Sequence, residues 1–321
     1  MKHLSDLSRW LRAVVAQGVS SLGAYQPLQT LAGQLRGGFI LAFHNLGSET
    51  FSELIQSLSP DEPVHLAELV DRLRHGKSTN GIFAITVDDG VGETVRALSA
   101  VATQRNWPIT FFLPTAYLDT RDGMPFQWLD TVLPRLPRTR LELRSGLVDL
   151  STESARRRFE RRLRARMYSQ PAENYSKFIE EVVCYAVSHG WLSREHDAPP
   201  PPISWDEVAA LAAYPAVRFE SHGVTHIAAA ALPPDQLERE LRESQERIRT
   251  HTGLACRHFA YPFGTPDSIG PLAPLLVGKH YDSAVTMARG RLRNRDPFLL
   301  PRIPLYAGDS TTVARLKVLS A

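Results

Sequence analysis

The sequence predicts an α/β protein with a mainly parallel sheet. Short, almost entirely apolar runs alternate with helical segments, which is the pattern of parallel strands covered on both faces. Several of these runs end in polar residues, and loops from separate strands converge at the carboxyl ends of parallel strands. The chain has 321 residues, of which 43% are hydrophobic, so it can bury a sizeable core, and a single α/β barrel fits this length.

The composition narrows the class of protein. A formal net charge of +3 and 22% charged residues do not indicate a nucleic-acid binder. The two cysteines form no CxxC pair, which argues against a thiolate zinc site. The first residues contain no long uncharged apolar run, because Arg9 and Arg12 interrupt it. We therefore expect a cytoplasmic protein that meets its substrate inside the cell.

Residues 1–37 are predicted to form an N-terminal helical extension, since apolar residues recur at helical spacing from Leu4 to Val15. This helix either docks on the main body or lies on a membrane surface with its basic residues near anionic head groups.

Residues 38–321 are predicted to form the main body. Its helices are expected at 64–74, 93–104 and 234–252, the last closed by Gly253. Its strands are expected at 39–43, 82–87, 109–113, 217–219, 258–261, 283–286 and 299–305.

A helical insertion is predicted at about residues 116–200. One helix, 153–167, carries seven arginines from Arg156 to Arg166, and a second is expected at about 174–188. The arginines are interpreted mainly as a solvated face. The alternatives are a contact with a phosphate-bearing substrate or with an anionic membrane. After four prolines at 199–202, the sequence SWDE at 204–207 is a capping box that begins the next helix.

Two motifs carry the candidate chemistry: Asp88-Asp89-Gly90 after one predicted strand, and HGVTH, from His222 to His226, after another. Two imidazoles and one carboxylate can hold a divalent metal with an open position for water. On one helical turn, the β-carbons of the two histidines would lie roughly 5–6 Å apart. The second carboxylate would then serve as a general base. Either motif alone is often a turn or a chance match, so the prediction depends on both together.

The same residues resemble a known family. Val87–Gly90 (VDDG) resembles the TFDDG motif of the NodB-like polysaccharide deacetylases, carbohydrate esterase family 4. Ser221–His226 (SHGVTH) resembles their HSxxH-type metal motif, and Arg257–Gly264 (RHFAYPFG) resembles their RxxxxPY groove motif. The resemblance covers roughly residues 38–305, apart from the insertion.

This resemblance implies a deformed, incomplete (β/α) barrel that removes an N-acetyl group from an amino sugar. Asp88 matches the catalytic base, and Asp89, His222 and His226 match the metal ligands. The metal is expected to be zinc, although cobalt, nickel and manganese also bind such ligands.

The groove motif implies substrate-binding positions. Tyr261, Pro262 and Phe263 are expected there, and the Phe263 backbone amide matches the donor to the oxyanion. Many members have an arginine two residues before the motif proline, near the base. Because Ala260 stands at that position, we expect Arg302 to substitute for it, and Arg302 is grouped with the substrate-binding residues.

The general acid is less easily placed. The family's C-terminal histidine motif is not visible after residue 286. In circularly permuted members the acid histidine ends an N-terminal strand, and Phe39–His44 (FILAFH) resembles that strand. His44 is therefore interpreted as the acid; the alternative is a histidine that only closes the barrel rim.

The expected substrate is an N-acetylated saccharide, in a glycan or linked to a lipid or a nucleotide. Two other functions stay open: hydrolysis of a non-sugar amide or C–N bond, and a catalytically silent carbohydrate-binding barrel. Peripheral membrane contact is expected, if at all, through the N-terminal helix or the Arg156–Arg166 helix.

Overall fold

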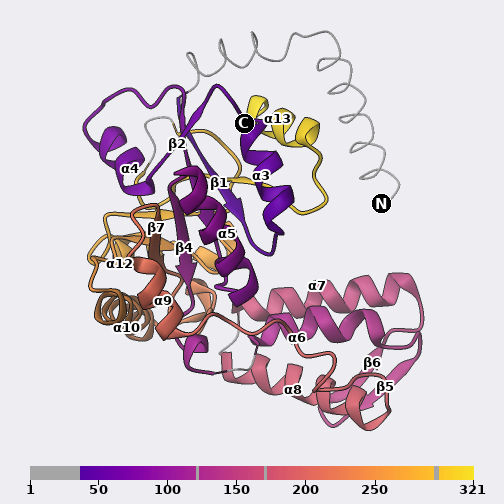
Figure 1. Ribbon diagram of the computed structural model, residues 1–321. Helices are drawn as coiled ribbons and strands as arrows, with labels where there is room; N and C mark the ends of the chain where they lie inside the picture. The colour runs from indigo at the N-terminus through magenta and orange to yellow at the C-terminus, as the bar shows by residue number, and fades with distance from the viewer. Residues whose placement is uncertain (1–36, 121–122, 170–171, 293–295) are drawn as a thin grey trace.

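The computed structural model describes residues 37–120, 123–169, 172–292 and 296–321. The predicted N-terminal helical extension falls on residues 1–36 and so lies outside the described residues (Figure 1).

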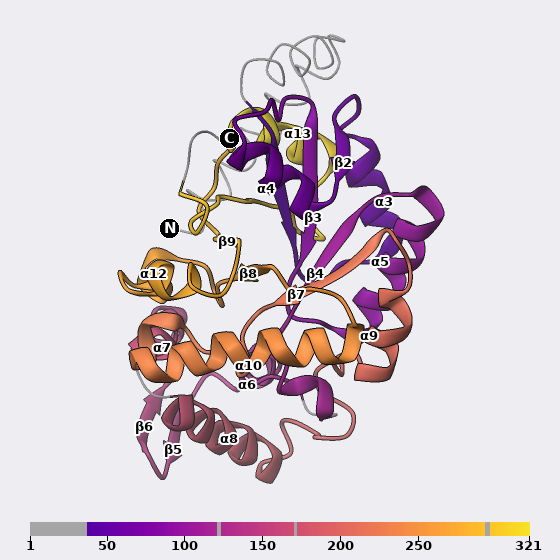
Figure 2. The same ribbon diagram turned by 90° about the vertical axis from the view of Figure 1, so that its left-hand side faces the viewer.

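An eight-stranded sheet forms the main body (Figures 1 and 2). Its order is β10-β1-β3-β4-β7-β8-β9, with β2 beside β3, and all of its ladders are parallel. The sheet curls without pairing β9 to β10, which is an incomplete (β/α) barrel and confirms the predicted fold class. The strands are β1 (Phe39–Phe43), β2 (Glu62–Val64), β3 (Ile82–Val87), β4 (Ile109–Leu113), β7 (Val217–Ser221), β8 (His258–Ala260), β9 (Ser283–Val285) and β10 (Ile303–Pro304).

Helices cover the outer face of this sheet, except the helix that follows β2, whose buried residues pack with the inward-facing side chains of the strands (Figure 2). Local signals set several of their ends: Ser204 caps α9 by accepting from the Glu207 amide, and Gly253, with φ 68°, ends α10. The helices are α3 (Ser48–Gln56), α4 (Leu66–Arg74), α5 (Gly92–Arg105), α9 (Trp205–Ala212), α10 (Pro234–Thr252), α11 (Pro266–Ile269), α12 (Ala273–Val277) and α13 (Thr311–Leu319).

Strand alternation divides the core into two layers. On β3, Phe83, Ile85 and Val87 pack into the large outer core, whereas Ala84 packs into the inner cluster. Because side chains alternate along a strand, Thr86 shares the inner face with Ala84, and Asp88 follows it at the strand end. The sequence pattern of β3 thus directs one acidic side chain toward the barrel interior.

Between β4 and α9 the chain leaves the sheet and forms a smaller unit that projects from the barrel (Figure 1). This unit has its own apolar core, which includes Val132, Leu163 and Val182. We call it the insertion. Its elements are α6 (Pro125–Val132), the antiparallel hairpin β5 (Arg140–Leu143) and β6 (Gly146–Asp149), α7 (Glu153–Ser169) and α8 (Ala172–Ser188).

Candidate functional site

The acidic doublet lies at the carboxyl end of β3. The Asp88 amide donates to the Phe43 carbonyl across to β1, which extends the parallel pairing by one residue and holds Asp88 in place. Asp89 and Gly90 then take positive φ values of 74° and 65°. A β-carbon on Gly90 would also lie only 2.9 Å from Leu113, so glycine is required at this turn. The turn separates the two carboxylates, both of which stay buried at 2% and 8% exposure.

The histidine motif forms a loop after β7, not a helical turn. Gly223 has φ 80° and His226 has φ 55°, and no helix begins within residues 222–226. The helical spacing predicted from the HxxxH pattern is therefore wrong, because left-handed residues fold the chain back on itself. The two imidazoles still come together, with ring centroids 4.7 Å apart.

Glu240 on α10 holds this loop in shape. One carboxylate oxygen accepts from the Val224 and Thr225 amides at 2.7 and 3.0 Å, and the other accepts from the Thr225 hydroxyl at 2.7 Å. The sequence motifs gave no signal for this residue, since it lies inside a long helix among other charged residues.

Asp89, His222 and His226 form one cluster whose candidate ligand atoms lie within 4.8 Å of one another. Asp89 Oδ1 is 3.6 Å from His222 Nε2 and 3.4 Å from His226 Nε2. Ligands placed about 2.1 Å from a tetrahedral zinc ion are themselves about 3.4 Å apart. The spacing of these three donors therefore fits one divalent ion.

The protonation state of His222 also fits a metal ligand. Its Nδ1 lies 2.7 Å from the Ala260 carbonyl oxygen, to which it donates, so Nε2 carries a lone pair toward Asp89. Burial lowers the pKa of His222 to about 4, which keeps the imidazole neutral at neutral pH, as metal binding requires.

Arg302 pairs with Asp88 in the barrel interior. Its Nη1 and Nη2 donate to Asp88 Oδ1 and Oδ2 at 2.8 and 2.7 Å, and Nε donates to the Thr286 carbonyl. Burial raises the pKa of Asp88, but the Arg302 guanidinium outweighs it and holds that pKa below its usual range. The carboxylate is therefore ionised at neutral pH, as a general base must be.

This contact places Arg302 near Asp88, as the sequence comparison suggested. The substrate-binding role given to it does not fit, because its side chain is 0% exposed. Its physical effect is to orient and ionise Asp88.

A sequence model for the family described as polysaccharide deacetylase matches residues 75–269, which is more than half of the chain. The chain belongs to the polysaccharide deacetylase family. Enzymes of this family hydrolyse amide N-acetyl bonds and depend on a metal, so this deacetylase is a hydrolase of that class. A search of curated proteins found no match.

Solved deacetylase structures share the fold of this deacetylase at low sequence identity. The deacetylase PplD of Streptococcus pyogenes, in complex with acetate, has a TM-score of 0.55 at 10% identity and covers 87% of this chain and 95% of its own. IcaB of Ammonifex degensii has a TM-score of 0.54 at 14% identity over 88% and 97%. The BpsB deacetylase domain of Bordetella bronchiseptica has a TM-score of 0.54 at 13% identity over 84% and 95%.

A cavity of ≈ 790 Å³ opens over the cluster of the deacetylase. His44 lines it, with a side chain that is 38% exposed and Nε2 3.8 Å from Asp88 Oδ2. Phe263 packs edge-on against His226 at 4.9 Å between ring centroids, and Phe126, from α6 of the insertion, lies against the same imidazole at 4.7 Å. The insertion thus forms one wall of the site, which the sequence did not reveal.

Of the other two residues predicted for the groove, Tyr261 lines the cavity and Pro262 does not. Tyr261 lines the cavity, but its hydroxyl donates to the Phe298 carbonyl at 3.1 Å, so it supports the wall rather than offering a free polar group. Pro262 is buried and does not line the cavity. Backbone strain gathers here as well: of the four non-glycine residues with positive φ in the described part of the chain, Asp89, His226 and Phe263 lie in this site.

Proposed function

We propose that this deacetylase is metal-dependent and removes the N-acetyl group from an amino sugar in a glycan or in a lipid- or nucleotide-linked saccharide. One observation carries the proposal: the Asp89, His222 and His226 donors cluster within 4.8 Å beside the cavity that Asp88 and His44 also line. A metal cluster, an ionised base and a solvent-accessible imidazole in one cavity are the groups that amide hydrolysis needs.

We assign a divalent metal to the three-residue cluster, held by Asp89 Oδ1 and the Nε2 atoms of His222 and His226. One oxygen and two nitrogen donors favour zinc, with cobalt, nickel and manganese as other ions that such a set binds. When bound, the ion acts as a Lewis acid toward the acetamide carbonyl.

Asp88 acts as the general base in this proposal. Its carboxylate is ionised and fixed by two donors from Arg302, so it can accept a proton from the attacking water without turning away. The Phe263 backbone amide is assigned to the developing oxyanion through the family resemblance, and Phe263 lines the cavity as that role requires.

His44 acts as the general acid. Of the three histidines among the described residues that line the cavity, His222 and His226 are assigned to the metal, which leaves His44 for proton transfer. Its exposed position allows it to reach a leaving nitrogen. A protonated imidazole there would deliver a proton to the amine as the C–N bond breaks and acetate forms.

The remaining expectations stay predictions. No helix in the described part of the chain is long and apolar enough to cross a membrane. A cytoplasmic location and peripheral membrane contact are proposed from the sequence alone. A catalytically silent barrel is disfavoured because the base and the three donors are all present. Hydrolysis of a non-sugar amide is the second candidate, and a substrate comparison separates it.

Four variants test the proposal, with acetate release from an N-acetylglucosamine oligomer and bound metal measured on the same samples. Asp88→Asn should retain metal and lose turnover. Asp89→Ala, His222→Ala and His226→Ala should each lose both. More than a few per cent activity in Asp88→Asn would remove Asp88 as the base, and unchanged metal content in an alanine variant would remove that residue from the ligand set.

A further inference from the structure

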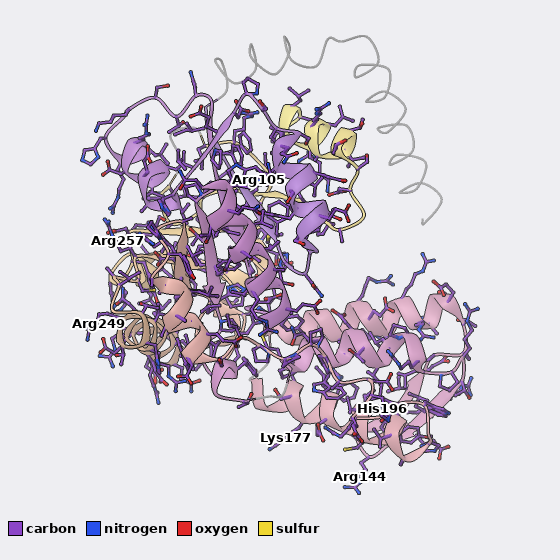
Figure 3. All side chains as sticks on the ribbon, in the orientation of Figure 1. Arg105, Arg144, Lys177, His196, Arg249 and Arg257 are labelled. Carbon is purple, nitrogen blue, oxygen red and sulfur yellow. The ribbon has the colours of Figure 1, made fainter. Side chains whose placement is uncertain are left out.

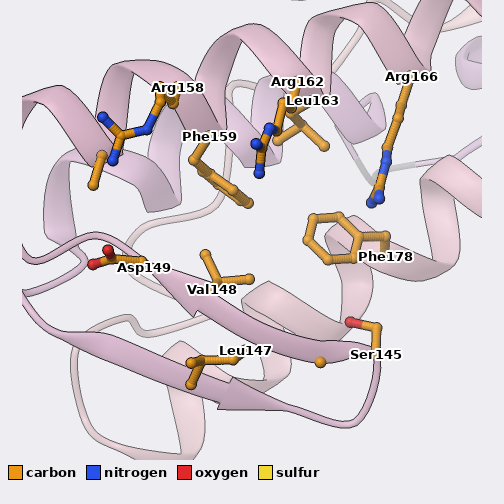
Figure 4. Close-up of a pocket in the computed structure, with 12 residues that line it drawn as sticks. Ser145, Leu147, Val148, Asp149, Arg158, Phe159, Arg162, Leu163, Arg166 and Phe178 are labelled. Carbon is orange, nitrogen blue, oxygen red and sulfur yellow. The ribbon is translucent and has the colours of Figure 1, made fainter.

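A second hollow, of ≈ 410 Å³, lies within the insertion between α7, the β5–β6 hairpin and α8 (Figure 4). Polar and charged groups form most of its lining, and Val148, Phe159, Leu163 and Phe178 form the apolar part. Among the described residues, it shares no lining residue with the active-site cavity. We call it the arginine pocket, for the three side chains that border it.

Arg158, Arg162 and Arg166 follow one another at intervals of one helical turn and point from α7 toward the hairpin (Figure 4). One carboxylate lines the pocket: Asp149 lies at the Arg158 end and already accepts from the amide and hydroxyl of Ser151. Within the described residues, Arg162 and Arg166 form no ion pair. The pocket therefore has a surplus of positive charge.

The three side chains are exposed, as the solvated face predicted from the sequence requires, but they gather over one hollow. Arg157, on another side of α7, is paired with Glu153, and Arg144 and Lys177 project outward from the insertion (Figure 3). Like charges one turn apart repel each other, so an anion bound between the three arginines would relieve that repulsion. The guanidinium fork matches phosphate oxygens, and the side chains of Val148, Phe159, Leu163 and Phe178 in the same lining offer contacts to a hydrophobic group attached to that phosphate.

Helix α7 lines both the arginine pocket and the active-site cavity. Glu160, on α7, lines the active-site cavity, whereas Arg158 and Arg162, on the two sides of it in sequence, line the arginine pocket. The two hollows therefore lie on different faces of one helix, whose diameter with side chains is about 10–12 Å. A short oligosaccharide can cover such a span.

We propose that the arginine pocket binds the phosphate of an apolar carrier to which the N-acetylated saccharide is attached. The substrate would then be a phosphate-linked saccharide, with its amino sugar at the metal cluster and its carrier phosphate at Arg162 and Arg166. This inference rests on the proposed function for the identity of the sugar, but binding at the pocket can be measured independently of turnover.

The first experiment measures binding of farnesyl diphosphate to the metal-loaded full-length protein by calorimetry. Arg162→Gln/Arg166→Gln should weaken binding roughly tenfold or more, since it removes two charge-assisted contacts. Arg161→Gln, an exposed neighbour that does not line the pocket, is the matched control for Arg162→Gln and should bind normally. Equal affinities in all these proteins would overturn the proposal.

The second experiment compares acetate release from a neutral N-acetylglucosamine pentamer and from the same pentamer carrying a prenyl diphosphate. The double variant should raise KM about tenfold for the linked pentamer and leave kcat and the neutral pentamer unchanged. Equal losses on both pentamers, or none on the linked one, would overturn the carrier role. Loss of binding to phosphatidylglycerol vesicles without a change in KM would assign the pocket to a membrane lipid and also overturn it.

The two proposals fail in different ways. If neither pentamer releases acetate while farnesyl diphosphate still binds through Arg162 and Arg166, the proposed function is wrong and phosphate recognition stands. If the neutral pentamer is deacetylated normally and the diphosphate does not bind, the function stands and the arginine pocket has no such ligand.

Discussion

Replacing Arg302 with methionine should destabilise the protein strongly, because it leaves the Asp88 carboxylate buried without a counter-ion. Asp88 is 2% exposed and receives hydrogen bonds of 2.8 and 2.7 Å from the guanidinium. A hydrogen bond to a charged group contributes about 1.5–3 kcal/mol. Breaking a buried pair on one side costs about 3–5 kcal/mol, and we expect Arg302→Met to fall in that range.

The double variant Asp88→Asn/Arg302→Met tests the cause. It buries no net charge, so it should be more stable than Arg302→Met by about 2 kcal/mol, and the two substitutions should be strongly non-additive. Arg302→Lys keeps the charge but loses the two-pronged contact, so it should lie between Arg302→Met and the unaltered protein.

The assay is urea unfolding of chelator-treated protein, which removes any effect of the metal on stability. Arg291→Met is the matched control, because that buried guanidinium donates to the Gly37 and Val318 carbonyls. This substitution should lower the free energy of unfolding by the same amount whether residue 88 is Asp or Asn. A loss below about 1 kcal/mol for Arg302→Met, or simple additivity with Asp88→Asn, would refute the reasoning.

Three further predictions concern the site and its support. His44→Ala should lower kcat by ~10²–10⁴-fold without changing metal affinity, and a near-normal rate would reject the acid role. Glu240→Gln should weaken metal binding about 10–100-fold by loosening the histidine loop, whereas Glu243→Gln, on the same helix, should not; equal affinities would assign Glu240 a purely structural role. His258 is 2% exposed, and burial lowers its pKa to about 4, so the unfolded chain takes up a proton there first as pH falls from 6.5. His258 should thus account for about 3 kcal/mol of the stability lost between pH 6.5 and 4. The His258→Gln variant, unfolded in urea without metal, should lose about that much less than the unaltered protein; an unchanged pH dependence would contradict it.

Strands and helices with strong local signals were predicted closely. β1, β3 and β4 have the bounds expected from their apolar runs, and α10 runs from Pro234 to Thr252 as expected. Runs of apolar residues, a proline at the first turn and a glycine after the last are local features, so they can be read without knowing the fold. Helix α3 was missed although its buried Phe51, Leu54 and Ile55 lie at helical spacing, and the β5–β6 hairpin was missed because its strands are short and partly exposed.

The candidate site was predicted in composition but not in shape. The residues of the two motifs do meet, yet His222 and His226 meet through left-handed backbone and not through helical spacing. A spacing of four residues is compatible with both geometries, and the choice depends on Glu240, which binds the loop from another element.

By itself, the sequence determined the alternating parallel architecture, the family and the residues that end the strands, since each of these depends on short stretches of chain. Only the tertiary structure decided that Arg302, 214 residues from Asp88, would be fully buried and would pair with both oxygens of that carboxylate. It also decided that α6 and α7 would line the active-site cavity, and that α7, α8 and the β5–β6 hairpin would form the arginine pocket. Contacts of this kind depend on how the sheet curls and where the insertion packs, which no local pattern of residues records.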